Sequence, residues 1–288
     1  MSDDTSATPT PDDTRAAVAP RPEAPEAPGV TGILEVLGAN ATAPNAAGPA
    51  SGYVLHTDEG LVLVDAGPGT MAAFTSRYPL DAIRAFVVTH LHADHSLDLM
   101  AWAYRWTFPQ VLPPLPLLVP EGATASVAAF DALFGIPTLS TMNAPVSQSF
   151  VLEAMPMDGT TSIRLPGAEL VSFAARHAVP SAALRFRVGD RSYTFSSDTG
   201  DCPGLRDAAR GADVFVCEAT WLDEPAPEDR GHGHLTPAEA GTIAAESGVG
   251  TLVLTHLSRP EDGAESVRRA RERFDGPIVL AAPGVRVA

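Results

Sequence analysis

The sequence contains no lysine: all 19 of its basic residues are arginines. Acidic residues are almost twice as numerous, at 35, and the formal net charge is −16 at pH 7. A surface of that charge repels polyphosphate, so the composition argues against a long nucleic acid as the partner. A small anionic substrate stays compatible with it, because bound divalent cations would reverse the charge locally.

Cysteine is scarce as well. Cys202 and Cys217 are the only two cysteines, and they do not form a C-x-x-C pair. We therefore expect reduced, buried thiols and a cytoplasmic protein rather than a disulfide framework. The N-terminus, "MSDDTSATPTPDD", lacks the positive and apolar regions of a signal peptide. No uninterrupted apolar run is long enough to span a bilayer, so no membrane partner is expected.

Two regions of different composition follow one another. Residues 1–30 are rich in proline, alanine and acidic residues and show no apolar periodicity. Such a segment buries too little apolar surface to offset its ordering entropy, which predicts a disordered, acidic tail. Residues 31–288 are expected to form the folded domain.

Short apolar strands and amphipathic helices alternate in the folded part. Early hairpin-like strands give way to β–α–β alternation, which predicts an α/β fold with an αββα layering. The expected strands cover residues 32–37, 52–57, 61–65, 84–89, 115–119, 149–153, 168–175, 182–188, 191–196, 213–217, 251–255 and 277–281. The expected helices cover residues 69–78, 96–108, 123–135, 202–211, 236–248 and 263–276.

A cluster of metal-ligand residues follows the strand "AFVVT". His90, His92, Asp94 and His95 form an H-x-H-x-D-H pattern. In the chain that leaves a strand, His90 and His92 can point the same way and bind one ion. Asp94 and His95, at the start of the next helix, can then face a second ion. Imidazole and carboxylate ligands suit zinc, with iron or manganese as alternatives.

Three further candidate ligands lie at the ends of apolar strands. They are His177 in "VSFAARHAVP", Asp198 in "YTFSSDTG" and His256 in "TLVLTHLSRP". Any one of them alone could simply cap a strand. Together with the H-x-H-x-D-H pattern, they indicate strand ends that converge on one site.

These motifs, with Asp65 in "LVLVDAGPG", resemble the ordered motifs of the metallo-β-lactamase superfamily over about residues 31–282. The resemblance implies an αββα sandwich with two metal ions at one edge of the sheets. One ion would take His90, His92, His177 and Asp198. The other would take Asp94, His95, His256 and the bridging Asp198. Asp65 would hold the ligand loop, although a buried aspartate with no role in the site is the alternative.

The segment "CEATWLDEPAPEDRGHGHLT" resembles two motifs of the ribonuclease Z-like phosphodiesterase branch. Glu218 and His234 occupy the matching positions. An imidazole that is oriented by a carboxylate can donate a proton or hydrogen bond to a phosphoryl or leaving oxygen. The alternative for His234 is an ordinary loop histidine near a helix start.

The long basic arm of tRNA 3′-processing enzymes is missing, because only the tight turn "VGDR" separates the strands between His177 and Asp198. The chain therefore looks closer to the armless actinobacterial atypical cyclic nucleotide phosphodiesterases. The resemblance implies a hydrolase that cleaves a small phosphodiester, most of all a 3′,5′-cyclic nucleotide, with a metal-bridging hydroxide, Asp94, Glu218 and His234 as its catalytic groups. It also implies a homodimer.

Other functions remain open. A lactonase, thioesterase or arylsulfatase could use the same scaffold, and so could an RNA-processing enzyme without the arm. A metal-bound sensor is disfavoured, because no ligand is missing. Four aromatic residues could stack on a base, although core positions suit them better: Trp102, Tyr104, Trp106 and Trp221. Arg259 could touch a phosphate or face solvent. His56 and His232 match no motif and are predicted to be surface residues.

Overall fold

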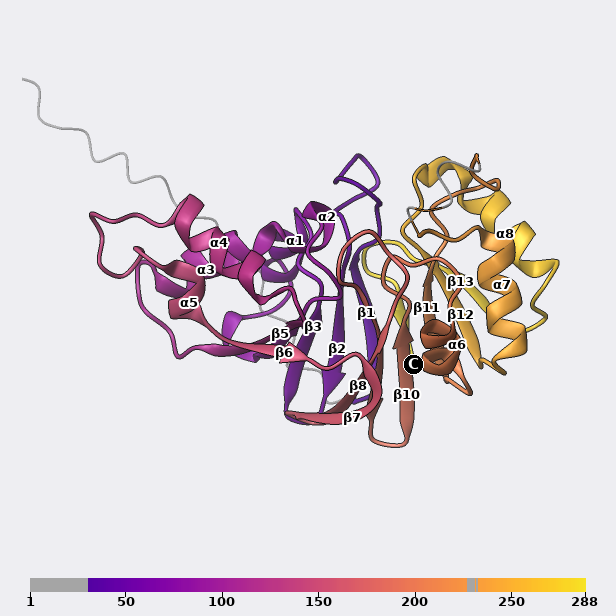
Figure 1. The fold of residues 1–288 in the computed structure, drawn as a ribbon, viewed down its shortest axis with the longest axis horizontal. Helices are drawn as coiled ribbons and strands as arrows, with labels where there is room; N and C mark the ends of the chain where they lie inside the picture. Colours follow the sequence, from indigo (N-terminus) through magenta and orange to yellow (C-terminus); the bar gives the residue numbers. More distant parts are fainter. Residues whose placement is uncertain (1–30, 227–230, 232) are drawn as a thin grey trace, which may run out of the picture.

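The computed structural model describes residues 31–226, 231 and 233–288. The predicted disordered tail and His232 lie outside the described residues. Two seven-stranded sheets pack face to face, with one group of helices on each outer face (Figure 1). The α/β fold with αββα layering is therefore confirmed.

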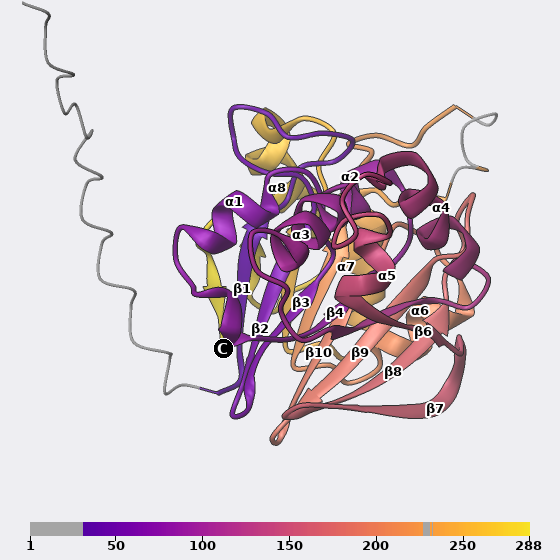
Figure 2. The ribbon, with the colours of Figure 1, turned by 90° about the vertical axis from the view of Figure 1, so that its left-hand side faces the viewer.

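The first sheet comes from the N-terminal half of the chain and the last strand. Its strand order is β14-β1-β2-β3-β4-β5-β6. Its strands are β1 (Ile33–Gly38), β2 (Gly52–Thr57), β3 (Gly60–Val64), β4 (Ile83–Val87), β5 (Leu115–Pro120), β6 (Phe150–Met155) and β14 (Arg286–Val287). Its outer face carries α1 (Thr70–Thr75), η1 (Leu80–Ala82), α2 (Ala93–Ser96), α3 (Asp98–Thr107), α4 (Thr124–Phe134) and α5 (Pro145–Ser149) (Figure 2).

The second sheet has the order β13-β12-β11-β10-β9-β8-β7. Its strands are β7 (Asp158–Leu165), β8 (Ala168–Ala174), β9 (Ala182–Val188), β10 (Arg191–Phe195), β11 (Val214–Glu218), β12 (Thr251–Thr255) and β13 (Ile278–Leu280). The helices α6 (Pro203–Ala209), α7 (Pro237–Glu246) and α8 (Gly263–Arg271), with η3 (Pro260–Asp262), belong to this half.

Alternation along the central strands explains the layers. In β3, Val62 and Val64 face the core between the sheets, whereas Leu61 and Leu63 face the outer helices with Trp102 of α3. Successive strand side chains point to opposite faces, so a strand that is apolar throughout must be covered on both sides. The apolar runs of the sequence thus require both the second sheet and the helical layer.

Parallel pairing brings the candidate residues to one edge. β3 runs parallel to β4, and β10 runs parallel to β11, which runs parallel to β12. Asp65 directly follows β3 and His256 directly follows β12, while His90 and Asp198 each lie three residues beyond a strand. Carboxyl ends of parallel strands open onto a shared crevice, which is where sites form in α/β proteins.

Some sequence predictions differ from the structure. β7, β14 and α5 were not predicted: β7 is a mostly exposed, polar strand, β14 has two residues, and neither gives an apolar period. The prediction that His56 is a surface residue is wrong, since its side chain is 1% exposed and lies 3.5 Å from Glu35. Both cysteines are unpaired, but Cys202 is only half-buried.

Candidate metal centre and active site

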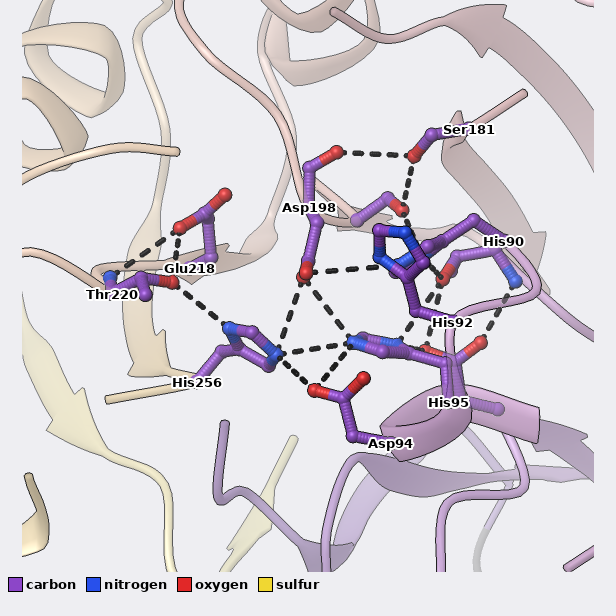
Figure 3. Close-up of polar contacts among 12 residues, drawn as sticks. His90, His92, Asp94, His95, Ser181, Asp198, Glu218, Thr220 and His256 are labelled. Atoms are coloured by element: carbon purple, nitrogen blue, oxygen red, sulfur yellow. Dashed lines mark hydrogen bonds and ion pairs between the residues drawn. The ribbon is translucent and has the colours of Figure 1, made fainter. Parts of the chain in front are cut away.

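The structure brings all seven predicted ligands together at the sheet edge. Figure 3 labels each of them except His177. They form two groups that share Asp198, and within each group the candidate ligand atoms lie within 4.8 Å of one another. The first group is His90, His92, His177 and Asp198, and the second is Asp94, His95, Asp198 and His256.

The nitrogen atoms of these imidazoles face one another. Nε2 of His95 lies 3.1 Å from Nε2 of His256, and Nδ1 of His92 lies 3.0 Å from Nε2 of His177. Nε2 of His90 is buried and has no hydrogen-bond partner among the described residues. Lone pairs that converge in a buried place need a cation to offset their desolvation, and four N/O donors per group fit tetrahedral metal ligation. The donor set therefore suits two metal ions.

Asp198 lies between the two groups. Its Oδ1 is 3.3 Å from Nε2 of His95 and 3.4 Å from Nε2 of His256, whereas its Oδ2 is 3.6 Å from Nε2 of His90. One carboxylate oxygen thus faces each group. This is the arrangement that a bridging ligand requires.

Asp65 supports the centre from behind. It belongs to neither group, and its Oδ2 lies 2.7 Å from Nδ1 of His95. Its carboxylate also accepts hydrogen bonds from the backbone N–H and the hydroxyl of Thr89. A carboxylate that holds the far nitrogen of a histidine fixes the ring and leaves Nε2 free for an ion.

Similar contacts orient three further rings. Nδ1 of His90 lies 3.2 Å from the Thr89 hydroxyl and 3.3 Å from the Ser197 hydroxyl, and Nδ1 of His256 lies 2.9 Å from that of Thr220. Nδ1 of His177 lies 3.1 Å from the carbonyl oxygen of Gly233. Each of these contacts leaves Nε2 directed at the centre.

Strained backbone is concentrated at this edge. Within the described ranges, the non-glycine residues with positive φ are Thr42, Asp65, Ser197 and His256. The backbone N–H of Thr42 donates to Oδ2 of Asp94 at 2.7 Å, so all four touch the centre or its immediate partners. Such conformations cost about 1–3 kcal/mol each and persist where the surrounding structure imposes them.

Glu218 and His234 form a second feature beside the centre. Glu218 is 1% exposed, and its Oε1 lies 3.0 Å from Nδ1 of His234. Glu218 also accepts hydrogen bonds from the backbone N–H groups of Thr199 and Leu235. The His234 ring nitrogen is 4.0 Å from Oδ2 of Asp198, so the pair reaches the centre.

A glycine makes this approach feasible. Gly233 has φ of +74°, and a Cβ at this position would lie 2.0 Å from the carbonyl oxygen of Arg176. Only glycine allows the chain to pass so close and to place His234 against His177, with ring centroids 5.1 Å apart. Two residues later, Thr236 caps α7 in a capping box with Glu239, which anchors the segment.

Burial and charge act in opposite directions on these groups. Burial raises the pKa of Asp198, but the imidazoles of His256 and His95 outweigh it and hold the pKa well below its usual range. Burial and the neighbouring His95 lower the pKa of His90 well below its ordinary value. The ring is therefore neutral and can offer a lone pair to a metal ion. Burial also lowers the pKa of His234, yet Glu218 raises it to about 9 overall.

The other candidates occupy different places. Trp102 and Trp106 are buried in the outer core of the first sheet, and the Tyr104 hydroxyl donates to a backbone carbonyl. Trp221 lies beside His234, with ring centroids 6.2 Å apart. The Arg259 side chain is exposed and forms no hydrogen bond with the part of the chain that the structure describes.

The sequence did not indicate several supporting residues. Thr89 directly precedes the H-x-H-x-D-H pattern and Thr220 completes the C-E-A-T run, so their positions within motifs could have suggested both. Thr42 contributes a backbone N–H, and Ser197 a hydroxyl in an ordinary serine pair. No residue pattern marks either contact.

Comparison with known proteins places the chain in a family. The model of the Beta-lactamase superfamily domain matches residues 61–257. The chain belongs to this superfamily. An uncharacterized protein of Mycobacterium tuberculosis is 33% identical over 254 residues, which cover 85% of this chain and 88% of the relative. A ribonuclease Z of Salinispora arenicola is 28% identical over 288 residues, covering 86% of this chain and 93% of the relative.

The structure of the metallo-beta-lactamase fold protein YhfI from Bacillus subtilis superposes with a TM-score of 0.76 at 20% identity. The match covers 88% of this chain and 98% of YhfI, which shows that the two share the fold. Family, fold and donor set together make this superfamily member a metal-dependent hydrolase. No helix among the described residues combines the length and apolarity needed to cross a membrane.

Proposed function

We propose that the protein hydrolyses a small phosphodiester, with 3′,5′-cyclic nucleotides as the leading substrate class. The observation that carries this proposal is the Glu218–His234 pair at the rim of the metal-ligand groups. Hydrolysis of a phosphodiester needs a group that stabilises charge or supplies a proton at the leaving oxygen. His234 is a side chain placed for that role.

Two divalent ions, zinc first and manganese or iron as alternatives, would occupy the two groups. His90, His92, His177 and Asp198 would hold one ion, and Asp94, His95, His256 and the shared Asp198 the other. When bound, such ions make water nucleophilic near neutral pH and neutralise charge on phosphoryl oxygens. They would also offset the acidic side chains of the site, so that an anion can approach.

The chain's own side chains would then direct the reaction. Asp94, whose carboxylate is fixed by the backbone N–H of Thr42 at 2.7 Å, would accept a hydrogen bond or proton from the attacking water. His234 would donate to a phosphoryl oxygen or protonate the leaving 3′-oxygen. Glu218 would keep the imidazole in position through the contact at Nδ1, which leaves Nε2 for the substrate.

The size of the substrate follows from what surrounds the site. β9 and β10 pair as a tight hairpin, with Arg191 opposite Val188, so no arm emerges between His177 and Asp198. The net charge of −16 also disfavours long nucleic acid.

The two unpaired cysteines support a reducing, cytoplasmic location. The homodimer remains a prediction.

The test is a panel of substrates assayed with protein of measured metal content. It contains cyclic AMP, cyclic GMP, an aryl phosphodiester, an aryl sulfate, a lactone and a precursor tRNA. The proposal expects turnover of the cyclic nucleotides and the aryl phosphodiester. Turnover of the lactone or the sulfate with no phosphodiester cleaved would contradict it.

His234→Ala tests the assignment that carries the proposal. We expect turnover to fall about 10²–10⁴-fold, the usual contribution of a positioned acid or base, with both metal ions retained. Mass spectrometry for metals and kinetics on the same preparations measure this. Arg187→Gln, at an exposed position on β9, is the control. Loss of metal in His234→Ala would instead make His234 a ligand or a structural support.

RNA processing without an arm is the second candidate. It is favoured by the relative named ribonuclease Z, which matches across 86% of this chain. The precursor tRNA in the panel separates the two functions. Efficient cleavage of that RNA, with no turnover of cyclic nucleotides, would establish this candidate instead.

A further inference from the structure

A second pocket lies away from the metal centre. It has a volume of about 970 Å³ and is lined by residues of α1, η1, the start of β4, the last turn of α3 and the loop after α3. α3 begins three residues after His95, and its ten residues span about 15 Å to the pocket. Figure 2 shows α1 and α3 on the same outer face of the first sheet.

The inner wall of this pocket is apolar. Pockets of about 300–1,000 Å³ with such walls are the usual size for small organic ligands. The apolar side chains that line it include Met71, Leu80, Ile83, Trp106, Leu112 and Leu115. Five of these six are aliphatic, and Trp106 is 3% exposed, so the wall offers apolar contact rather than a free ring face for stacking.

Three arginines also line the pocket: Arg77, Arg84 and Arg105. Asp81 is the single acidic residue among the described lining residues, so the lining is cationic in a chain of net charge −16. The Arg105 side chain is exposed and forms no hydrogen bond or ion pair with any residue that the structure describes. It is therefore available to an anion.

Arg77 is held in place from behind. Its Nη1 donates to Oε1 of buried Glu35 at 2.6 Å. Glu35 also accepts from Nε of Arg286 at 2.8 Å, so one carboxylate is shared by two arginines and does not cancel both charges. Arg84 is fixed through bonds to the carbonyl oxygens of Glu59 and Ile83. The arginines are thus held in position by fewer acidic side chains than there are positive charges.

We propose that this pocket binds an amphiphile with an apolar body and an anionic head, of the acyl carboxylate type. The aliphatic wall takes the body, and the arginines take the head. Guanidinium groups bind carboxylates through charge-assisted hydrogen bonds, which select an anion over a neutral group of the same length. The site is separate from the metal centre and does not depend on the hydrolytic reaction.

Calorimetric titration of the full chain tests the proposal. The probes are decanoate, decan-1-ol and decyltrimethylammonium, each below its micellar concentration. We expect one decanoate per chain and at least about tenfold weaker binding of the alcohol, the effect of losing a charge-assisted contact. The cationic probe should not bind.

Two variants locate the site. Arg105→Gln should weaken decanoate binding up to about fivefold, the scale of one exposed charge contact. Thr75→Trp, at an exposed residue of α1 that lines the pocket, should abolish it by filling the space. Arg187→Gln, on β9 of the other sheet, is the matched control and should bind as the unmodified chain does. Thermal melting of each variant shows that it is folded.

Three results would overturn the proposal. One is the absence of saturable decanoate binding. Another is equal affinity for decanoate and decanol with no effect of Arg105→Gln, which would mean that the arginines select nothing. The third is sedimentation showing a dimer that Thr75→Trp dissociates while decanoate fails to bind, which would make this face an interface between two copies.

Discussion

Two buried carboxylates of the first and second sheets have opposite surroundings. Glu35 accepts hydrogen bonds at 2.6–2.8 Å from Arg77, Tyr78 and Arg286. The side chains that pair with the Asp198 carboxylate, in the part of the chain that the structure describes, are all histidines, at 3.3–4.0 Å. Glu35 is neutralised by the protein itself, whereas Asp198 and its neighbours converge at distances that leave room for ions. Burial alone therefore does not mark a functional site; incomplete pairing does.

The largest effect is expected for Asp198→Ala. The change removes the oxygens that face both ligand groups, so both ions should be lost. We expect activity to fall by more than about 100-fold, because mutation of a residue that only hydrogen-bonds a metal ligand already lowers metal affinity or activity about 10–100-fold. Metal analysis of the dialysed protein measures it. Full retention of two ions would show that Asp198 does not bridge.

Glu35→Gln should lower the stability of the fold and leave the metal centre unchanged. Burial alone would raise the pKa of Glu35, but hydrogen bonds from its partners lower it to about 2, from 4.5. That difference corresponds to about 3 kcal/mol of folding free energy at neutral pH. Urea unfolding of both proteins measures the loss. A metal deficit in Glu35→Gln would break the contrast between the two carboxylates.

Asp65→Asn should weaken the centre without dismantling it. The amide oxygen can still accept from Thr89, but the charged contact at 2.7 Å to Nδ1 of His95 is lost. We expect metal affinity to fall about 10–100-fold. Competition with a chelator measures it. An unchanged affinity would make Asp65 a buried structural aspartate.

The smallest effect is the pH dependence of the Glu35 contribution. Because its pKa is lower in the folded state, this contribution is complete above the unfolded value of 4.5 and is lost as the pH falls toward 2. The stability difference from Glu35→Gln should be constant from pH 7 to 5 and reach roughly half near pH 3. Unfolding series at several pH values check this. A stability difference that grows on acidification would mean that folding raises the pKa of Glu35 instead of lowering it.

Much of the centre could be predicted because its ligands sit beside regular elements. His90 and His92 follow an apolar strand, Asp198 lies three residues beyond a second strand, and His256 directly follows a third, so local periodicity and residue type were enough. The prediction was wrong for His56, because a polar residue that matches no motif is expected at the surface. In the structure its side chain faces Glu35 across neighbouring strands. The edge strand β7 was missed because its exposed residues have no apolar period.

The sequence by itself determined the alternating strands, the layering they require and the set of candidate metal-ligand side chains. Only the tertiary structure decided which groups support them. The backbone N–H of Thr42 meets Asp94 across 52 residues, and Arg286 meets Glu35 across 251. Such contacts depend on how strands and loops pack, and a backbone donor carries no residue signature. The same reason hides the arginine-lined pocket, because Arg77 and Arg105 come together only when α1 and α3 pack on one sheet.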